Sequence, residues 1–268
     1  MVFCTAFSVD KFPYLRRIYR MPDLALDKIK PAAANKIGPL LEELLREFRE
    51  RIHSIHITGT AVTDDFNEKV SDVNSVVVLR EMHLGFLKSL APLGKKHGKR
   101  KVAAPLIMTP DYIRSSLDVF PIEFLNFKYI HVTVFGEDIF KDLIIDRMDL
   151  RHQCERDLKT KVLGLRQLYI SSQGDKRLLS ERFISSITGY IPLFRGIIAL
   201  YGKVPPVRQS DVITMLAAET GISPHVFKKV LQAKHQQIKL TIDELNTIFE
   251  DYYAITERLG TIVDEIKE

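Results

Sequence analysis

The stretch IHITGTAVTDDFNEKVSDVNSVVVL spans residues 55–79 and holds two β-rich segments on either side of a polar connection. The first segment ends at Gly59-Thr60, and the second covers residues 73–79. Short runs of β-branched residues bounded by glycine and polar clusters are typical of strands. The stretch therefore predicts two strands joined through a turn or a short helix.

The ends of these two segments carry residues suited to holding a phosphate and a cation. Gly59 and Thr60 close the first strand, where backbone amides can approach a phosphate because glycine has no Cβ. Asp72 and Asn74 follow at the start of the second strand, and alternation along a strand points both side chains to the same face. Two oxygen-bearing side chains there could hold a hard cation against a bound triphosphate.

With these residues the chain resembles the nucleotidyltransferase superfamily that includes DNA polymerase beta, kanamycin nucleotidyltransferase and the poly(A) and CCA-adding enzymes. The superfamily pattern is a hydrophobic residue, Gly and Ser or Gly, then Asp-hydrophobic-Asp some nine to thirteen residues later. Thr58-Gly59-Thr60 and Asp72-Val73-Asn74 occupy those positions. The resemblance covers residues 34–136 in detail. It implies an α/β (α+β) domain with a mixed sheet, in which Gly59 and Thr60 hold a nucleoside triphosphate. It also implies Mg²⁺ as cofactor and transfer of a nucleoside monophosphate to an acceptor that the sequence leaves unidentified.

Asn74 departs from this pattern, because the superfamily has a second metal-binding carboxylate there. An amide oxygen can ligate a cation but brings no negative charge, so we expect weak Mg²⁺ binding. Thr60 replaces the usual Ser and keeps the hydroxyl group. The alternative interpretation is therefore a catalytically degenerate protein that uses the same fold to bind a nucleotide or a partner.

The superfamily takes a third carboxylate from a neighbouring strand, and Glu123 is our candidate. It lies between apolar residues in the segment 119–127, which we expect to be a strand. Asp118 is the competing candidate, because strand register cannot be read from the sequence. The resemblance implies that Glu123 and Asp72 are catalytic and that Asp72, Asn74 and Glu123 bind the metal. Glu123 could equally be a partly buried acid paired with a lysine or arginine of a helix.

Periodicity predicts the remaining elements and divides the chain into two domains. Helices are expected over 34–53, 82–93 and 110–116, and strands over 102–108 and 131–135. From residue 148 every segment has helical spacing, with helices over roughly 148–172, 178–201, 210–220, 224–236 and 242–266. Thr241 and Glu244 form a capping box before the last helix. We therefore predict a nucleotidyltransferase-like domain over residues 1–146 and an all-α helical bundle over residues 147–268.

The charge balance is basic, with 39 Lys and Arg residues against 34 Asp and Glu, a net charge of +5. Residues 95–101, KKHGKRK, are expected to form an exposed loop. Nucleic acid is a possible partner through the cationic side chains of this loop, which are Lys95, Lys96, Lys99, Arg100 and Lys101. Residues 210–236 could alternatively form a DNA-binding helix-turn-helix, with Lys228, Lys229 and Lys234 on the second helix.

The cysteine count and the hydropathy indicate the compartment. Cys4 and Cys154 are too few for a disulfide framework, and the sequence has no CxxC or HExxH zinc motif. No apolar run reaches the length of a membrane helix, and the first residues lack a signal peptide's basic start. We therefore expect a cytoplasmic protein without a membrane partner.

Overall fold

The computed structural model describes residues 24–172, 174–236 and 240–266, so Cys4 and the predicted absence of a signal peptide lie outside the described residues. The contacts divide the chain into two compact units. The described part of the first unit is residues 24–62, Asn67–Thr109 and Val132–Asp138, and that of the second is Thr63–Phe66, Pro110–His131 and the chain from Ile139 onward. The predicted division at residue 146 differs, because the contacts group residues 110–131 with the helical part.

A four-stranded mixed sheet is the centre of the first unit, as the sequence predicts. Its strands are β1 (Ile52–Thr58), β2 (Asn74–Leu79), β3 (Leu106–Met108) and β4 (His131–Gly136). Their order across the sheet is β3-β2-β1-β4, with β1 antiparallel to β2 and β2 parallel to β3. The predicted strand over 102–108 is shorter than expected, since only an isolated bridge between Val73 and Val102 precedes β3.

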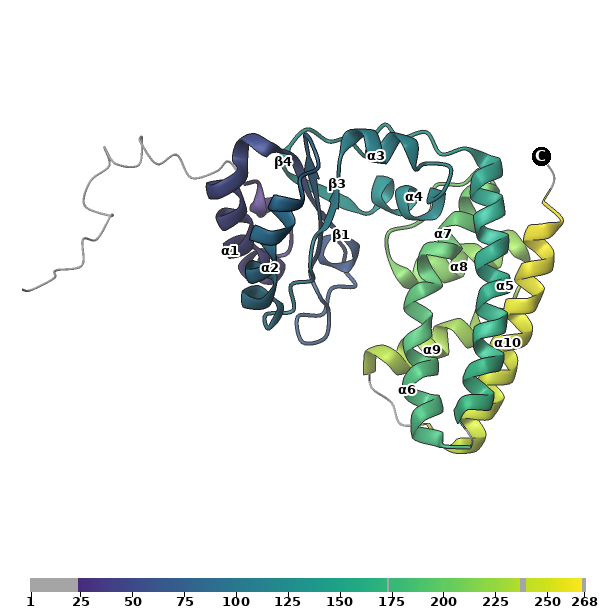
Figure 1. The fold of residues 1–268 in the computed structure, drawn as a ribbon. Helices are drawn as coiled ribbons and strands as arrows, with labels where there is room; N and C mark the ends of the chain where they lie inside the picture. The colour runs from purple at the N-terminus through teal and green to yellow at the C-terminus, as the bar shows by residue number, and fades with distance from the viewer. Residues whose placement is uncertain (1–23, 173, 237–239, 267–268) are drawn as a thin grey trace, which may run out of the picture. The chain divides into compact units, whose positions relative to one another are not determined.

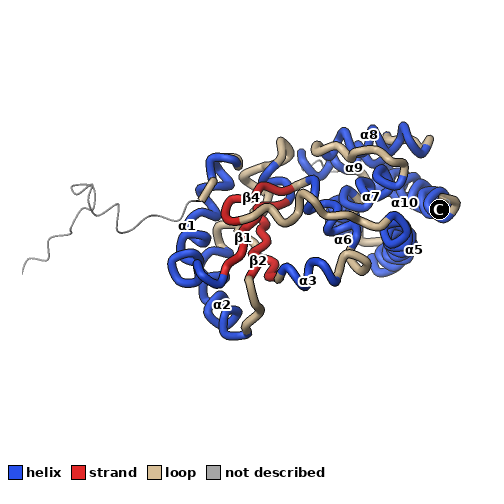
Figure 2. Tube along the Cα trace, turned by 90° about the horizontal axis from the view of Figure 1, so that it is seen from above, coloured by secondary structure: helices blue, strands red, loops and turns tan. Residues whose placement is uncertain are grey.

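Two helices, α1 (Pro31–Phe48) and α2 (Leu84–Gly98), cover one face of this sheet in both views (Figures 1 and 2). Apolar residues recur along α1 at helical spacing and are fully or almost fully buried, namely Ile37, Leu40, Leu41, Leu44 and Leu45. The two helices are tied together by Glu43, which accepts hydrogen bonds from Lys96 and from His97 Nε2, the latter at 3.1 Å. The Lys96 ammonium group, and then His97, hold the pKa of Glu43 below its usual value. This packing fixes the sheet face that carries Ile55 and Val77, which are paired and fully buried.

The second unit is helical, as the sequence predicts. Its helices are α3 (Pro110–Ser115), α4 (Pro121–Tyr129), α5 (Arg147–Ser172), α6 (Lys176–Ser186), α7 (Ile191–Leu200), α8 (Gln209–Thr220), α9 (His225–Gln236) and α10 (Ile242–Asp264). The long helices α5 and α10 run side by side (Figure 1), and α10 begins with the predicted capping box of Thr241 and Glu244. The predicted single helix over 178–201 is α6 and α7 with a 3-10 turn between them, and Pro192 begins the second of these helices.

The stretch Arg177–Leu200 is long and apolar enough to span a membrane by length and composition alone. In this structure 61% of its most apolar window is buried inside the protein, across α6 and α7. Phe183, Phe194 and Ile197 are fully buried in the core of the second unit. The apolar character of the stretch is therefore explained by core packing.

The predicted strand over 119–127 is wrong, because these residues lie mainly in helix α4. Pro121 occupies the first turn of α4, where proline costs no hydrogen bond and its fixed φ suits a helix. The side chain of Gln153 on α5 accepts a 2.7 Å hydrogen bond from the buried backbone amide of Ile122, which satisfies one of the free donors at the helix start. Ile122 and Leu125 then pack into the helical core.

Candidate functional site

The turn after β1 lies against the start of β2, as the sequence motif requires. Thr58 pairs with Asn74 across the two strands, and a 3-10 turn over Gly59–Val62 follows. Gly59 has φ of +71°, and a Cβ at this position would lie 3.4 Å from Nδ2 of Asn74. A left-handed residue this close to a neighbouring side chain favours glycine. The structure thus brings the Gly59-Thr60 turn and Asn74 together.

The side chains of the predicted cation site are accessible. Asp72 and Asn74 are exposed, whereas Val73 between them is fully buried. This alternation is that of a strand, so Asp72 and Asn74 leave the backbone on the same side. One carboxylate and one amide oxygen are therefore accessible at the start of β2, and the amide group lies beside Gly59.

On the sheet face that carries Asn74, β1 supplies polar side chains and β3 supplies apolar ones. On β1, Ser54, His56 and Thr58 alternate on this face and are buried. On β3 the residues paired with the same face of β2 are Leu106 and Met108. Within its bounds, β3 thus supplies apolar side chains and no carboxylate to this face.

Glu123 lies in the first turn of α4 in the second unit and is exposed. Its Oε2 accepts a 2.8 Å hydrogen bond from Nε2 of Gln153. Burial, and to a smaller extent the negative charge of Glu123, raise the pKa of nearby Asp157. Asp118, the competing candidate, is also exposed and lies in the turn before α4. The expectation that either acid lies on a strand of the sheet is wrong, and their role as third acid stays a prediction.

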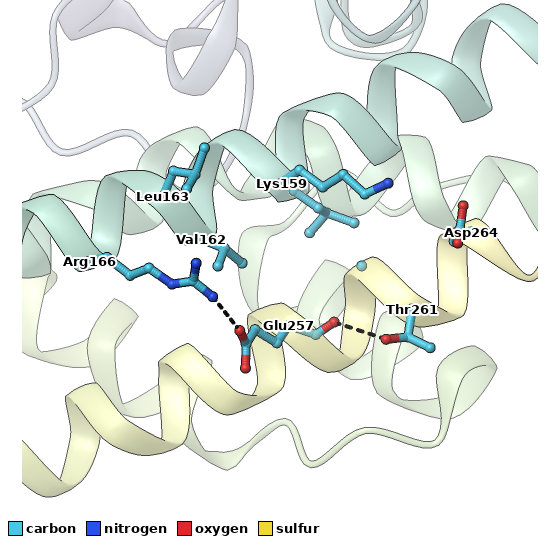
Figure 3. Close-up of a pocket in the computed structure, with 9 residues that line it drawn as sticks. Lys159, Val162, Leu163, Arg166, Glu257, Thr261 and Asp264 are labelled. Carbon is cyan, nitrogen blue, oxygen red and sulfur yellow. Dashed lines mark hydrogen bonds and ion pairs between the residues drawn. The ribbon is translucent and has the colours of Figure 1, made fainter.

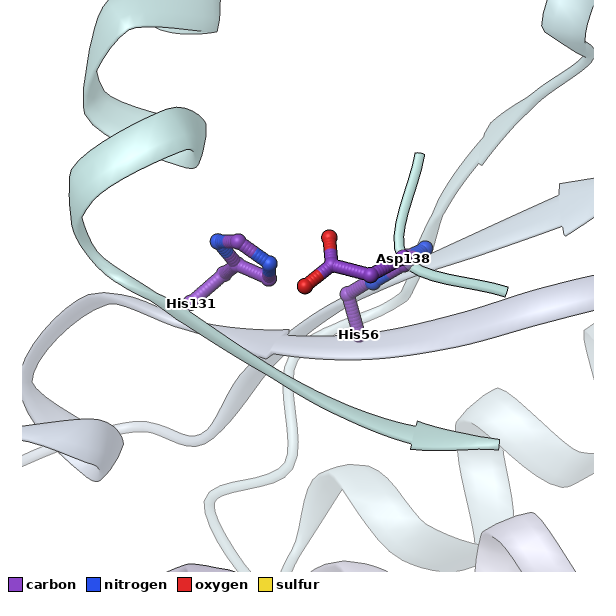
Figure 4. A group of neighbouring side chains, drawn as sticks. All are labelled: His56, His131 and Asp138. Carbon is purple, nitrogen blue, oxygen red and sulfur yellow. The ribbon is translucent and has the colours of Figure 1, made fainter. Parts of the chain in front are cut away.

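His56, His131 and Asp138 form a group that the sequence pattern did not predict. One ligand atom from each lies within 4.8 Å of the others (Figure 4). His56 is fully buried on β1, His131 is the first residue of β4, and Asp138 follows the end of that strand. The only signal in the sequence is a polar residue at an inward position of an apolar strand, so periodicity alone could have marked His56 but not its partners.

The basic run over 95–101 is mostly helical, which corrects the prediction of an exposed loop. Residues 95–98 form the last turn of α2. Lys96 is paired with Glu43, and Lys101 donates a hydrogen bond to the carbonyl group of Lys69. Lys95, Lys99 and Arg100 are exposed. Two of the five cations thus make contacts within the first unit, and a nucleic-acid interface here stays a prediction.

In the predicted helix-turn-helix, Gly221 ends α8 in the left-handed conformation and α9 follows. Lys228 is exposed, whereas Lys234 is half-buried and contacts Thr188. Burial lowers the pKa of Lys234. The inner face of α9 packs into the core, so this helical pair has a structural role, and DNA binding stays an untested alternative.

A cavity of about 570 Å³ lies between α5 and α10, and none of the residues that line it is a predicted site residue (Figure 3). Both of its cationic side chains are already paired, since Arg166 donates a 2.9 Å hydrogen bond to Glu257 and Lys159 is paired with Glu155. Cys154 is buried in the core of the same unit, and burial raises the pKa of its thiol, so it is unsuited to nucleophilic chemistry.

No protein-family model and no curated protein matches the sequence. Among solved structures, the chain is similar to spectinomycin adenyltransferase AAD(9) from Enterococcus faecialis, crystallised with ATP and spectinomycin. The TM-score is 0.52 at 16% sequence identity, over 84% of this chain and 98% of that one. The likeness confirms the fold class, a nucleotidyltransferase-like sheet domain followed by a helical region.

Proposed function

We propose that this protein binds a nucleoside triphosphate at the Gly59-Thr60 turn and transfers its nucleoside monophosphate to an acceptor hydroxyl or phosphate. The observation that carries the proposal is the left-handed Gly59 placed against Asn74, where the two central strands of the sheet end, in a chain with this fold. Backbone amides of such a turn can cradle phosphate oxygens. In the transfer, the acceptor oxygen bonds to the α-phosphorus and pyrophosphate leaves.

The donor set beside the turn fits a Mg²⁺ ion that arrives with the triphosphate. Mg²⁺ usually keeps several waters and takes only one or two protein carboxylates, because the phosphates supply other ligands. The carboxylate of Asp72 and the amide oxygen of Asn74 meet that minimum and are both exposed. The ion would neutralise phosphate charge during the transfer. The role of Glu123 as base stays a prediction from the sequence, and the binding proposal does not depend on it.

A second candidate function is nucleotide binding without transfer. Asn74 in place of a carboxylate favours it, and so do the apolar residues Leu106 and Met108 on the strand beside β2. Both features lower the negative charge that would hold a catalytic ion. The two functions share the same binding step and differ only in the formation of a labelled product.

Thermal unfolding with MgCl₂ and each nucleoside triphosphate tests the shared binding step. At 100 times Kd, a bound ligand stabilises the folded state by about 2.7 kcal/mol. At about 2–4 °C per kcal/mol for a chain of this size, the midpoint rises by about 5–10 °C. We expect such a rise for at least one triphosphate, dependent on Mg²⁺ and lost in Asp72→Ala. Asp142→Ala is the matched control, because Asp142 is an exposed aspartate outside the proposed site.

No shift with any triphosphate, or a shift that Asp72→Ala leaves intact, would contradict the placement of the site. If binding is observed, a radiolabel on the α-phosphate of the bound nucleotide distinguishes the two functions. Spectinomycin is a first trial acceptor, because the structural neighbour was crystallised with it. Label transferred to an acceptor supports the transferase, whereas binding without transfer favours the second candidate.

Restoring the missing carboxylate should strengthen binding. We expect Asn74→Asp to tighten the binding of a Mg²⁺-nucleotide about tenfold, which corresponds to about 1.4 kcal/mol, because a second charge faces the ion. Isothermal titration calorimetry with a non-hydrolysable triphosphate measures it. Asn67→Asp makes the same charge change at an exposed asparagine of the same unit and should leave the affinity nearly unchanged. Unchanged or weaker affinity in Asn74→Asp would contradict the proposed site.

A further inference from the structure

The polar side chains on strands β1 and β4 converge on one point, away from the Gly59 turn. His56 Nδ1 lies 2.9 Å from Oγ1 of Thr133, which joins the two neighbouring strands through their side chains. Thr133 and His131 are two residues apart on β4, so they share a face. By its contacts His131 is grouped with the second unit, and Val132 with the first. His131 is nevertheless the first residue of β4, and this strand fixes its backbone beside β1.

Asp138 is brought to the same point by the turn that ends β4. Gly136, the last residue of the strand, has φ of +74° and lies so close to β1 that a Cβ would be 2.1 Å from the carbonyl oxygen of His53. The chain then turns, and the Asp138 carboxylate faces the two imidazoles (Figure 4). Three potential ligands thus converge from two strands and the turn that follows.

The surroundings of His56 are those of a metal-binding histidine. It is fully buried, with Nε2 at 2.8 Å from Oγ of Ser54 and Nδ1 at 2.9 Å from Oγ1 of Thr133. A metal-bound histidine needs an oxygen partner for its second ring nitrogen, which fixes the ring and its tautomer. Whichever nitrogen binds an ion, the other keeps a hydroxyl partner. The serine or threonine whose oxygen now faces the binding nitrogen has to turn to another χ1 rotamer to make room for the ion.

We propose that His56, His131 and Asp138 bind a divalent transition-metal ion, with Zn²⁺ as the best match. Two imidazoles and one carboxylate are a common zinc set, and they leave one position open, whereas Mg²⁺ prefers oxygen ligands alone. Zinc bonds of about 2.0–2.1 Å place tetrahedral ligand atoms roughly 3.3 Å apart. The present separations are within 4.8 Å, so binding needs inward movements of about 1 Å.

Titration of ZnCl₂ into the full chain, dialysed first against a chelator, tests the proposal without any nucleotide. We expect one equivalent of Zn²⁺ per chain and a rise in the thermal midpoint on binding. His131→Asn and Asp138→Asn should each lower the affinity at least about a hundredfold, because losing a ligand exceeds the 10–100-fold cost of losing an outer partner. His152→Ala removes an exposed histidine of α5 and should change nothing.

Substitution with Co²⁺ supplies a second readout that does not depend on stability. Tetrahedral Co²⁺ absorbs strongly in the visible range, so an intense band that disappears in Asp138→Asn locates the ion. Circular dichroism of each variant shows whether it folds. The two variants are made at His131 and Asp138, so that the fully buried His56 is left unchanged. The proposal would be overturned if the unmodified protein binds Zn²⁺ as weakly as the two variants do. It would also be overturned if both variants bind Zn²⁺ as tightly as the unmodified protein does. Because no nucleotide is present, this result is independent of the proposed function.

Discussion

Gly136→Ala is expected to lower the free energy of unfolding of the first unit by about 3 kcal/mol. An alanine at φ of +74° is strained by roughly 1–2 kcal/mol, since its Cβ approaches the following carbonyl oxygen. The added Cβ would also lie 2.1 Å from the His53 carbonyl oxygen and 2.9 Å from Cα of Ser54. Both are backbone atoms of β1, which is paired on both sides and cannot move away.

The control for this prediction is Gly202→Ala in the second unit. Gly202 has φ of +72°, and among the described residues nothing lies within 4 Å of its added Cβ. Alanine there bears the backbone strain without the overlap, so about 1–2 kcal/mol is expected. Urea unfolding followed by far-UV circular dichroism measures both, because the chain has no tryptophan. Equal losses in the two variants would show that the approach of β4 to β1 is unimportant.

The sequence was sufficient where structure depends on neighbouring residues. The two strands around Gly59-Thr60, the helical character of the second half and the capping box of Thr241 are as predicted, although the helix predicted over 178–201 is divided into α6 and α7. Each depends on periodicity or on a turn signal within a short stretch. The contact of Gly59 with Asn74 could also be anticipated, because two antiparallel strands joined by one connection bring their facing ends together.

Helix α4 shows where local signals fail. Its nine residues include three aromatic ones and an isoleucine, which favour a strand by composition. The helix is stabilised by its environment instead, because Gln153 binds the amide of Ile122 and α5 and α7 pack against it. These partners lie well beyond any local sequence window, so tertiary contacts overrode the local preference.

Polar contacts between segments that are distant in the sequence could not be predicted from it either. His56 and His131 meet only because β4 lies beside β1, and a strand order cannot be deduced from composition. In the second unit, Asp65 accepts a 2.9 Å hydrogen bond from the amide of Gln209, at the start of α8. Burial lowers the pKa of Arg195 to about 10, and the charge of Asp65 partly opposes that shift. Such pairings are fixed by the fold rather than by spacing along the chain.

The aromatic core of the second unit should be the most sensitive part of the molecule to truncation. Phe227 on α9 is fully buried and has its ring 4.8 Å, centre to centre, from both Phe194 and Tyr252. It therefore joins α7, α9 and α10. Phe227→Ala is expected to lower the free energy of unfolding by about 4 kcal/mol, since it loses the transfer free energy of the ring and leaves a cavity.

The same substitution at an exposed phenylalanine isolates the effect of burial. Phe120 precedes α4 and is 39% exposed, so Phe120→Ala should cost well under about 1 kcal/mol. Phe227→Leu should fall between the two, because leucine refills part of the space. Urea midpoints by far-UV circular dichroism rank the three variants. A loss below about 1 kcal/mol in Phe227→Ala would mean that α7, α9 and α10 are held together by other contacts. The apolar stretch from Phe183 to Tyr201 would then need an explanation other than packing around these rings.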